Sequence, residues 1–226
     1  RPPDIHQPPS RLVCLENTHN RGGGSIYKVE NLAAIAKLGS DKGIRVHLDG
    51  ARLFNAALAS GTTVGELASK ADSVCVALSK GLGAPAGSVL CGATDFVETA
   101  RRFRKMLGGG MRQVGILAAA GLHALDHHVE RLAEDHENAK KLALGLAEMP
   151  GIQLEPEMVE TNIVMFEVVA TDLGADGLVE RLAAEGVLMI PFGPTTVRAV
   201  THLNVSTADI DKALEIIARF FKSSAS

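Results

Sequence analysis

The chain lacks several features that would indicate a membrane, a nucleic acid or a secreted scaffold. No apolar run approaches the length of about 18 residues that a membrane-spanning helix needs. Only three of the 226 residues are cysteines, and their spacing is not that of metal ligands. We therefore expect buried thiols in a reducing compartment. The formal net charge of −3 gives no general attraction to nucleic acid or to an anionic membrane. We expect no metal, no membrane and no nucleic acid among its partners.

The rest of the composition is that of an ordinary globular protein. Hydrophobic residues make up 46% of the chain and charged residues 22%. The length suits one large domain or two modest ones. The first residues, RPPDIHQPPS, contain no methionine and no signal-peptide pattern. We expect a loop over residues 1–10, in a chain that starts within a longer protein.

Strand-like and helix-like segments alternate along the whole sequence. Strands are predicted over residues 11–17, 44–49, 73–78, 88–92, 161–168, 187–190 and 196–202. Helices are predicted over residues 29–43, 50–60, 64–71, 94–107, 113–148 (with a break near 126–128), 173–186 and 207–221. Alternation of this kind favours an α/β fold. We expect a large α/β domain over residues 1–124 and a small α+β domain over residues 125–226.

One lysine, Lys80, lies in a glycine-rich loop between two apolar runs, in the stretch SVCVALSKGLGAPAGSVLCG. The loop is not typical of a dinucleotide-binding turn, because a strand-like run follows it where a helix should begin. It is not a Walker A loop either, since the lysine precedes the glycines and no GK[ST] is present. The lysine is thus either a solvated turn residue or an amine used in chemistry.

An aspartate, Asp49, ends another apolar strand in the stretch HLDGAR. In an α/β sheet the carboxyl ends of the strands face the ligand crevice, and Lys80 follows such an end as well. A carboxylate and an amine on separate strand ends match the needs of pyridoxal phosphate. The lysine forms a Schiff base with the aldehyde, and the carboxylate pairs with the protonated ring nitrogen.

Two arginine-bearing segments and one histidine are further candidates. The stretch RRFRKMLGGGMRQ is either a solvated basic helix followed by a linker, or a glycine loop in which Arg112 holds an anion. Arg198 falls within an otherwise apolar strand and needs a partner, either a substrate carboxylate or a structural one. His19 follows a strand in the stretch ENTHN. The histidines at 123, 127, 128 and 136 are expected on solvated helix faces.

Taken in order, these motifs resemble the L-threonine aldolases, a family of pyridoxal phosphate enzymes of fold type I. The stretches that carry the resemblance are LENTHN, VHLDGARLFNA, LSKGLGAPAGSV, RKMLGGGMRQ, LAAAG, EDHENA and VRAVTH. The resemblance runs from about Leu12 to the closing helix. It implies an aspartate aminotransferase-like large domain, with a mixed, mostly parallel sheet and helices on both faces, and a small C-terminal domain.

The resemblance also implies a function and a cofactor. Such an enzyme is a carbon–carbon lyase that cleaves L-threonine or L-allo-threonine, both β-hydroxy amino acids, to glycine and acetaldehyde. The alternatives are another fold type I enzyme, such as a β-eliminating lyase or an aminotransferase, and a truncated, non-catalytic homologue. Members of the family carry a long segment before the LENTHN strand, so this chain resembles the C-terminal two-thirds of such an enzyme.

By the same resemblance, Lys80 carries the cofactor and Asp49 pairs with its ring nitrogen. Arg52 helps to hold both the cofactor and the substrate carboxylate. Lys105 and Arg112 reach the cofactor phosphate of a neighbouring subunit.

On the substrate side, the resemblance makes Arg198 the main carboxylate clamp and places His19 near the β-hydroxyl, as a candidate base. It further implies a homo-oligomer, a dimer or tetramer with its sites at the dimer interface. We expect a cytoplasmic enzyme, with an organellar form left open.

Overall fold

The structure is a computed structural model that describes residues 5–169 and 173–223. The chain divides into two compact units. Unit 1 consists of residues Arg1–Thr18 and Ile26–Glu130, and unit 2 consists of residues His19–Ser25 and Arg131–Ser226. The division predicted from the sequence is different: it lies between residues 124 and 125 and assigns residues 19–25 to the first domain. Of the loop expected over residues 1–10, residues 5–10 lie outside helices and strands, and residues 1–4 lie outside the described part of the chain.

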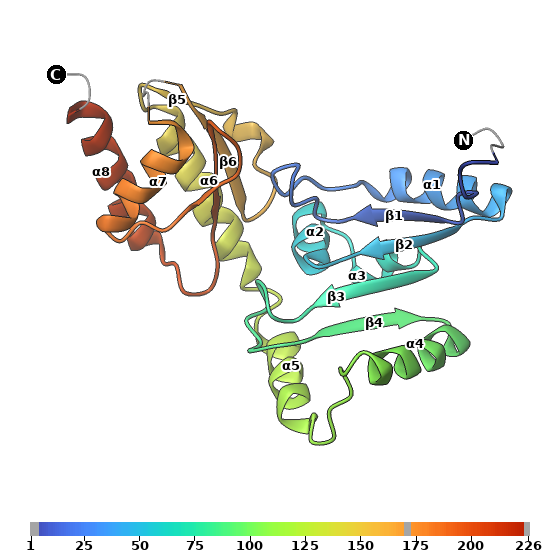
Figure 1. Ribbon diagram of the computed structural model, residues 1–226. Coiled ribbons are helices and arrows are strands. Elements are labelled where there is room, and N and C mark those ends of the chain that lie inside the picture. Colours follow the sequence, from blue (N-terminus) through green and yellow to red (C-terminus); the bar gives the residue numbers. More distant parts are fainter. Residues whose placement is uncertain (1–4, 170–172, 224–226) are drawn as a thin grey trace. The chain divides into compact units, whose positions relative to one another are not determined.

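Unit 1 is built on a mixed, mostly parallel sheet (Figure 1). Its strands are β1 (Leu12–Glu16), β2 (Arg45–Asp49), β3 (Ser73–Ala77) and β4 (Ser88–Gly92), in the spatial order β1-β2-β3-β4. The first three strands are parallel, and β4 runs antiparallel to β3. This arrangement confirms the α/β class expected from the sequence. It also brings the carboxyl ends of β1, β2 and β3 to one edge of the sheet.

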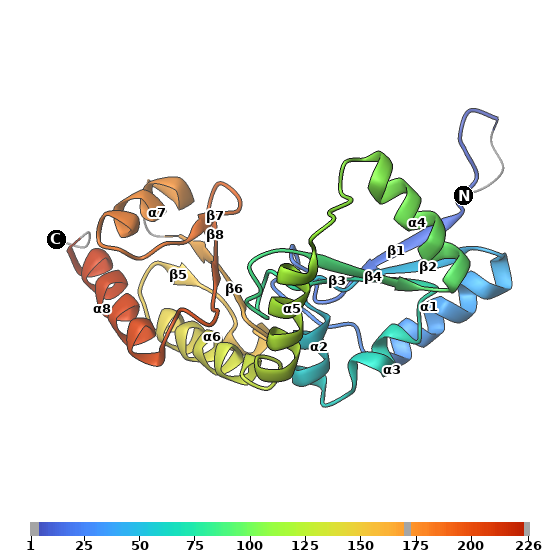
Figure 2. The same ribbon diagram turned by 90° about the horizontal axis from the view of Figure 1, so that it is seen from below.

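The helices of unit 1 are α1 (Val29–Lys42), α2 (Leu53–Ser60), α3 (Val64–Ala68), α4 (Thr94–Met106) and α5 (Gly115–His127). Figure 2 shows α1, α2 and α3 along one face of the sheet. Leu32, Leu53 and Leu67 from these helices form a buried cluster with Leu48 and Val74 of the sheet. The predicted glycine stop of α1 is confirmed, because Gly43 follows the helix with a left-handed φ of 64°.

The prediction that the cysteines are buried was wrong. Cys14 and Cys91 are exposed, and Cys75 is half-buried. The reason is their place in the sheet: Cys14 lies on β1 and Cys91 on β4, and these are the two edge strands. All five residues of β4 are exposed, and α4 beside it contributes no buried residue. An apolar run does not by itself indicate burial, because an edge strand has a neighbouring strand on one side only.

Unit 2 is an antiparallel sheet with three helices (Figure 1). The strands are β5 (Ile152–Gln153), β6 (Ile163–Val168), β7 (Ile190–Pro191) and β8 (Thr196–Val200), in the order β5-β6-β8-β7. The helices are α6 (Leu132–Ala147), α7 (Gly174–Ala184) and α8 (Thr207–Ser223), with a 3₁₀ turn at Pro156–Met158. Leu142, Leu146, Phe166, Leu178 and Ile217 form the centre of its buried core.

The strand predicted over residues 187–190 was wrong in extent. Only Ile190 belongs to a strand, which continues to Pro191 and pairs with β8. The backbone N–H of Val187 instead donates to the carbonyl of Leu182 at the end of α7, so this segment closes the helix before it can pair. The proline is tolerated because β7 is an edge strand. In the described part of the chain, no helix has both the length and the apolar character needed to cross a bilayer.

Candidate active site

Asp49 and Lys80 lie at the edge of the unit 1 sheet that is formed by the carboxyl ends of its parallel strands. Asp49 is the last residue of β2, and its backbone pairs with Cys75 in β3. The chain turns immediately afterwards, because the N–H of Gly50 donates to the carbonyl of Cys75 over 2.7 Å. The N–H of Ala51 donates to Oδ1 of the Asp49 side chain over 3.0 Å. The Asp49 carboxylate is therefore held at the strand end by a hydrogen bond from the turn that follows it.

Lys80 lies in the loop that joins β3 to β4. The loop is closed by backbone bonds from the N–H of Leu78 to the carbonyl of Gly87 and from the N–H of Ala84 to the carbonyl of Leu78, both 3.0 Å. Inside it, the N–H of Gly83 donates to the carbonyl of Lys80 over 2.8 Å. Leu82 and Ala84 are buried, whereas Lys80 is exposed. An ordered loop thus presents a lysine at the same sheet edge as Asp49.

Arg52 belongs to the turn that follows Asp49. It is half-buried and immediately precedes α2, whose first residue, Leu53, is fully buried. The HLDGAR motif therefore forms one compact unit of strand end, turn and helix start. Its aspartate and its arginine lie within four residues of each other in that turn.

Lys105 and Arg112 belong to the segment that follows β4. Lys105 is in the last turn of α4, and Arg112 is in the loop between α4 and α5; both are exposed. Gly110 packs on Lys105 so closely that a Cβ there would lie 2.8 Å from the lysine Cδ. The assignment of Lys105 and Arg112 to the phosphate of a neighbouring subunit stays a prediction.

In unit 2, Arg198 lies in the middle of β8, where it pairs with Met165 of β6 and with Ile190 of β7. Its Nη1 donates to Oδ1 of Asn20 over 2.6 Å. Its Cζ lies 5.0 Å from the centre of the Phe192 ring, within cation–π distance. Its Nε is buried and has no hydrogen-bond partner within the described residues. A half-buried guanidinium that is held in place by Asn20 and Phe192 is suited to bind a carboxylate.

His19 and Asn20 belong to the loop His19–Ser25, which folds back on itself. The N–H of His19 donates to the carbonyl of Ser25, and the N–H of Gly24 donates to the carbonyl of His19, both over 2.9 Å. The hydroxyl of Thr161 donates to the carbonyl of Gly24 over 2.8 Å. This bond joins the loop to the segment that leads into β6. A Cβ on Gly24, whose φ is +80°, would lie 2.5 Å from that hydroxyl. His19 itself is exposed.

Sequence reasoning missed two residues that contact the Arg198 guanidinium, Asn20 and Phe192. Asn20 stands next to His19 in a stretch already singled out, so its position was the available signal. Phe192 directly follows β7, six residues before Arg198, and its ring meets the guanidinium because the chain turns back there to pair β7 with β8. A second cation, Arg21, has its Cζ 5.2 Å from the same ring.

Two helix histidines are not on solvated faces, contrary to expectation. His136 is half-buried, and burial lowers its pKa to about 4. The reason is that buried Leu132 and Ala139 lie four residues before and three residues after it, on the inward stripe of α6. His128 is also half-buried, and its Nδ1 lies 2.6 Å from the carbonyl oxygen of Leu82.

The EDHENA motif stabilises unit 2. Asp135 is fully buried and accepts from Nη2 of Arg131 over 2.8 Å, while its backbone carbonyl accepts from the hydroxyl of Thr201 over 2.6 Å. Burial raises the pKa of the Asp135 carboxyl, and the Arg131 guanidinium acts in the opposite direction. Asn138 joins α6 to α8, since its side chain donates to the carbonyl of Val205 and accepts from Thr207.

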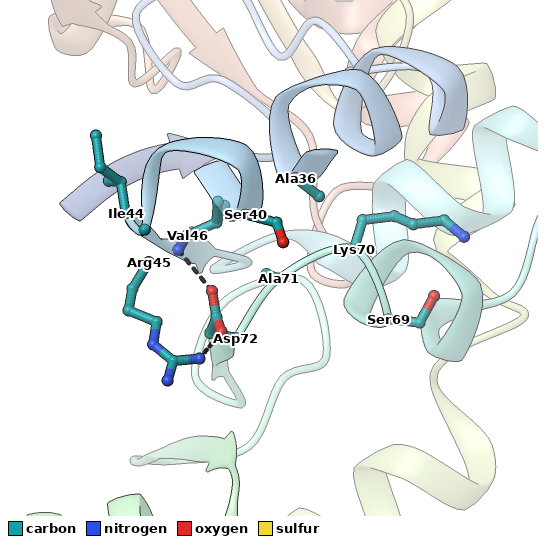
Figure 3. A pocket seen from close by; sticks show the side chains of 10 residues that line it. Ala36, Ser40, Ile44, Arg45, Val46, Ser69, Lys70, Ala71 and Asp72 are labelled. Carbon is teal, nitrogen blue, oxygen red and sulfur yellow. Dashed lines mark hydrogen bonds and ion pairs between the residues drawn. The ribbon is translucent and has the colours of Figure 1, made fainter. Parts of the chain in front are cut away.

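A cavity of about 420 Å³ lies at the opposite edge of the unit 1 sheet, where β2 and β3 begin (Figure 3). Asp72 and Arg45 point toward each other across it, and Asp72 also accepts from the N–H of Val46 over 2.8 Å. The Val46 amide and then the Arg45 guanidinium lower the pKa of the Asp72 carboxyl. The charged pair is thus satisfied within the protein, and the cavity contains none of the candidate residues.

The residues at the Asp49 edge fit pyridoxal phosphate in kind. The cofactor needs a primary amine for its aldehyde and an anionic acceptor for its ring N–H. An exposed lysine in an ordered loop and a carboxylate at the end of an adjacent parallel strand supply both. In unit 2, the half-buried Arg198 supplies a separate cation for a carboxylate.

The model of the beta-eliminating lyase family matches residues 1–171 of the sequence. The chain belongs to the beta-eliminating lyase family. This family member is 44% identical over 208 residues to the low-specificity L-threonine aldolase 1 of Arabidopsis thaliana, covering 92% of the chain and 58% of that relative. The resemblance to the L-threonine aldolases noted in the motifs is confirmed as similarity along most of the chain.

Two solved structures show the fold of this beta-eliminating lyase family member. A protein described as a candidate L-allo-threonine aldolase from Listeria monocytogenes EGD-E matches with a TM-score of 0.79 and 25% identity, covering 97% of the chain and 63% of that protein. A PLP-dependent aminotransferase from Streptococcus suis 89-1591 matches with a TM-score of 0.72 and 18% identity, covering 94% and 57%. The fold is therefore that of fold type I enzymes. The chain spans less than two thirds of the length of the relatives named here.

Proposed function

We propose that this chain belongs to a pyridoxal phosphate-dependent lyase that cleaves L-threonine or L-allo-threonine to glycine and acetaldehyde. The observation that carries the proposal is the placement of Asp49 and Lys80 at adjacent parallel strand ends of one sheet. The similarity to the named L-threonine aldolase of Arabidopsis thaliana supports the choice of substrate.

Within unit 1, each residue has a chemical role toward the cofactor. Lys80 would supply the amine that holds the cofactor aldehyde, and Asp49 would accept a hydrogen bond from the ring N–H. Arg52, on the same turn as Asp49, adds a positive charge for an anionic group of the cofactor or the substrate. When bound, the cofactor provides the electron sink that makes carbon–carbon cleavage possible.

Toward the substrate, we assign Arg198 to the carboxylate and His19 to the β-hydroxyl. Arg198 is suited to this because Asn20 and Phe192 fix the orientation of its guanidinium. His19 takes the hydroxyl proton as the Cα–Cβ bond breaks, so that acetaldehyde leaves with a carbonyl group. A proton then adds to Cα, and the atoms of threonine are accounted for as glycine and acetaldehyde.

An assay of the products tests the proposal. The chain is incubated with pyridoxal phosphate and L-threonine, and acetaldehyde and glycine are measured together. Equal amounts of both products, absent from the Lys80→Ala variant, are expected. Ammonia or a keto acid would instead identify another reaction of fold type I enzymes. The absence of any product would favour a non-catalytic homologue.

We also propose that the chain forms a homo-oligomer, a dimer or tetramer, in which Lys105 and Arg112 reach the cofactor phosphate of a neighbouring subunit. Support comes from the segment around α4 and α5, where Leu107 is 86% exposed and Ile116 is 80% exposed. Apolar surface of this kind is typical of an interface. Sedimentation equilibrium that gave a monomer at micromolar concentration would contradict the proposal.

A cytoplasmic location is the remaining proposal. Its support is that Cys14, Cys75 and Cys91 are free thiols in the described structure, which is typical of proteins in a reducing compartment. Fractionation of cells that express the tagged protein tests this, and recovery in an organelle would contradict it.

A further inference from the structure

Helix α5 contacts the lysine loop on both sides of Lys80. On one side, Gly121 packs against Leu78, two residues before the lysine, so closely that a Cβ at Gly121 would lie 3.0 Å from the leucine Cδ1. On the other side, Nδ1 of His128 lies 2.6 Å from the carbonyl oxygen of Leu82, two residues after the lysine. The contact thus joins residues that lie 46 positions apart in the sequence.

The chemistry of the second contact fixes which atom donates. A carbonyl oxygen can only accept, so the His128 Nδ1 must carry the proton. Both the neutral ring with its proton on Nδ1 and the charged imidazolium meet this condition, so protonation does not break the bond. An asparagine side chain could donate from its amide nitrogen in the same way, whereas alanine could not.

The position of the His128 ring is itself fixed from two directions. The backbone N–H of His128 donates to the carbonyl of Ala124 over 2.9 Å, which sets the residue at the end of α5. Its ring meets that of His123 edge to face, with centroids 5.4 Å apart and an interplanar angle of 87°. The Nδ1 of His128 is therefore a donor of fixed position that faces the lysine loop from the end of α5.

The end of the loop that His128 contacts is joined directly to the turn that carries Lys80. Leu82 is only 3% exposed, so its side chain is anchored while its carbonyl accepts from His128. The next residue, Gly83, has a left-handed φ of 73°, and its N–H closes the turn onto the carbonyl of Lys80 over 2.8 Å. A shift of the Leu82 carbonyl would therefore be passed to the turn that carries the lysine.

We propose that His128 is a positioning residue for Lys80: its Nδ1–H holds the lysine loop in the conformation that presents the amine to a carbonyl compound. The role given to the amine rests on the proposed function. The bracing of the loop does not rest on it, since it follows from the contacts alone.

The test compares three variants with the unaltered chain. His128→Ala removes the donor, and His128→Asn restores one. His127→Ala is the matched control, because His127 is the neighbouring residue, is exposed, and has its Nδ1 3.0 Å from the carbonyl of His123 in its own helix. Denaturant unfolding is measured for each variant, so that a loss of the whole fold is recognised.

The first readout is amide hydrogen exchange at Gly83 and Ala84, which needs no cofactor. Loss of one partly buried hydrogen bond is expected to speed exchange about tenfold in His128→Ala, and His128→Asn and His127→Ala should match the unaltered chain. Equal exchange in His128→Ala and the unaltered chain would overturn the proposal. Failure of His128→Asn to restore slow exchange, in a folded variant, would overturn the role of the hydrogen bond.

The second readout is the rate at which pyridoxal phosphate is trapped on Lys80 by borohydride, read by peptide mass spectrometry. A severalfold slower rate in His128→Ala, restored by His128→Asn, is expected. If the unaltered chain is labelled and His128→Ala is labelled at the same rate, the positioning role is overturned and the proposed function stands. If the unaltered chain is never labelled while loop exchange rises in His128→Ala, the bracing stands and the proposed function fails.

Discussion

Nη1 of Arg198 donates to Oδ1 of Asn20 over 2.6 Å, although the two residues are 178 positions apart in the sequence. The ring of Phe192, the residue that follows β7, meets the same guanidinium. Together these contacts fix the orientation of a half-buried cation before any ligand is present. A fixed cation binds a carboxylate without the entropy loss of ordering a long side chain, which is the value of preorganisation.

Removal of the Asn20 amide should weaken substrate binding. In Asn20→Ala, Arg198 loses a charge-assisted hydrogen bond, and we expect the KM for threonine to rise about ten- to hundredfold. Cofactor affinity should not change, because no cofactor role is assigned to Asn20. Steady-state kinetics and a cofactor titration measure the two effects. Asn204→Ala, an exposed asparagine of unit 2, is the control. An unchanged KM in Asn20→Ala would contradict the role of this contact.

His136 should make the protein less stable in mild acid. Burial lowers its pKa to about 4, from an ordinary value of 6.5. Because the folded-state pKa is the lower one, this contribution to stability is present above pH 6.5 and is lost as the pH falls toward 4. Between pH 7 and pH 5 the loss is about 2 kcal/mol of the free energy of unfolding.

Denaturant unfolding at the two pH values measures this loss in the unaltered chain and in His136→Gln. The variant should lose about 2 kcal/mol less than the unaltered chain between pH 7 and pH 5. Any constant effect of the substitution cancels in the comparison. His127→Gln, which alters an exposed histidine, should keep the pH dependence of the unaltered chain. Identical pH dependence in all three proteins would show that His136 is not buried in solution.

Asp72 should stabilise unit 1 through the Val46 amide more than through Arg45. Val46 is buried and its N–H donates to Asp72, so Asp72→Ala leaves a buried donor unmet and should cost about 1–2 kcal/mol of the free energy of unfolding. Arg45 is largely exposed, so Arg45→Ala should have little effect. Thermal unfolding of both variants measures the difference, and a larger effect of Arg45→Ala would refute this order.

The acid limb of stability gives a separate test of Asp72. The Val46 amide and the Arg45 guanidinium lower the pKa of its carboxyl below the ordinary value of 3.8. The stabilisation is therefore present above that value and is lost as the pH falls through the lower, folded-state pKa. The stabilities of the unaltered chain and of Asp72→Asn should begin to converge only as the pH falls below about 4, and a difference that stays constant there would argue against the shift.

Much of the fold could be predicted because local signals and tertiary structure agree. The period of α1, its glycine stop at Gly43 and the apolar run of β2 each specify one element, and the structure confirms them. The strand ends at Asp49 and before Lys80 could be assigned to one sheet edge, because parallel strands align their carboxyl ends. The roles of these residues in catalysis remain predictions.

What could not be predicted depends on contacts between distant segments. The exposure of Cys91 follows from the place of β4 at the edge of the sheet, which its own residues do not encode. The Asn20 partner of Arg198 comes from loop 19–25, so no window of sequence around β8 contains it. The contact of His128 with the Leu82 carbonyl is of the same kind, since a histidine at a helix end is otherwise read as solvated.

The most direct test of the account is to find the lysine that reacts with pyridoxal phosphate. The chain is mixed with the cofactor and reduced with borohydride, and the labelled peptide is mapped by mass spectrometry. The account predicts one pyridoxyl group on Lys80, with less label in Asp49→Ala and none at this position in Lys80→Ala. Label spread over other exposed lysines, such as Lys37 and Lys105, with Lys80 no more reactive than they are, would contradict it.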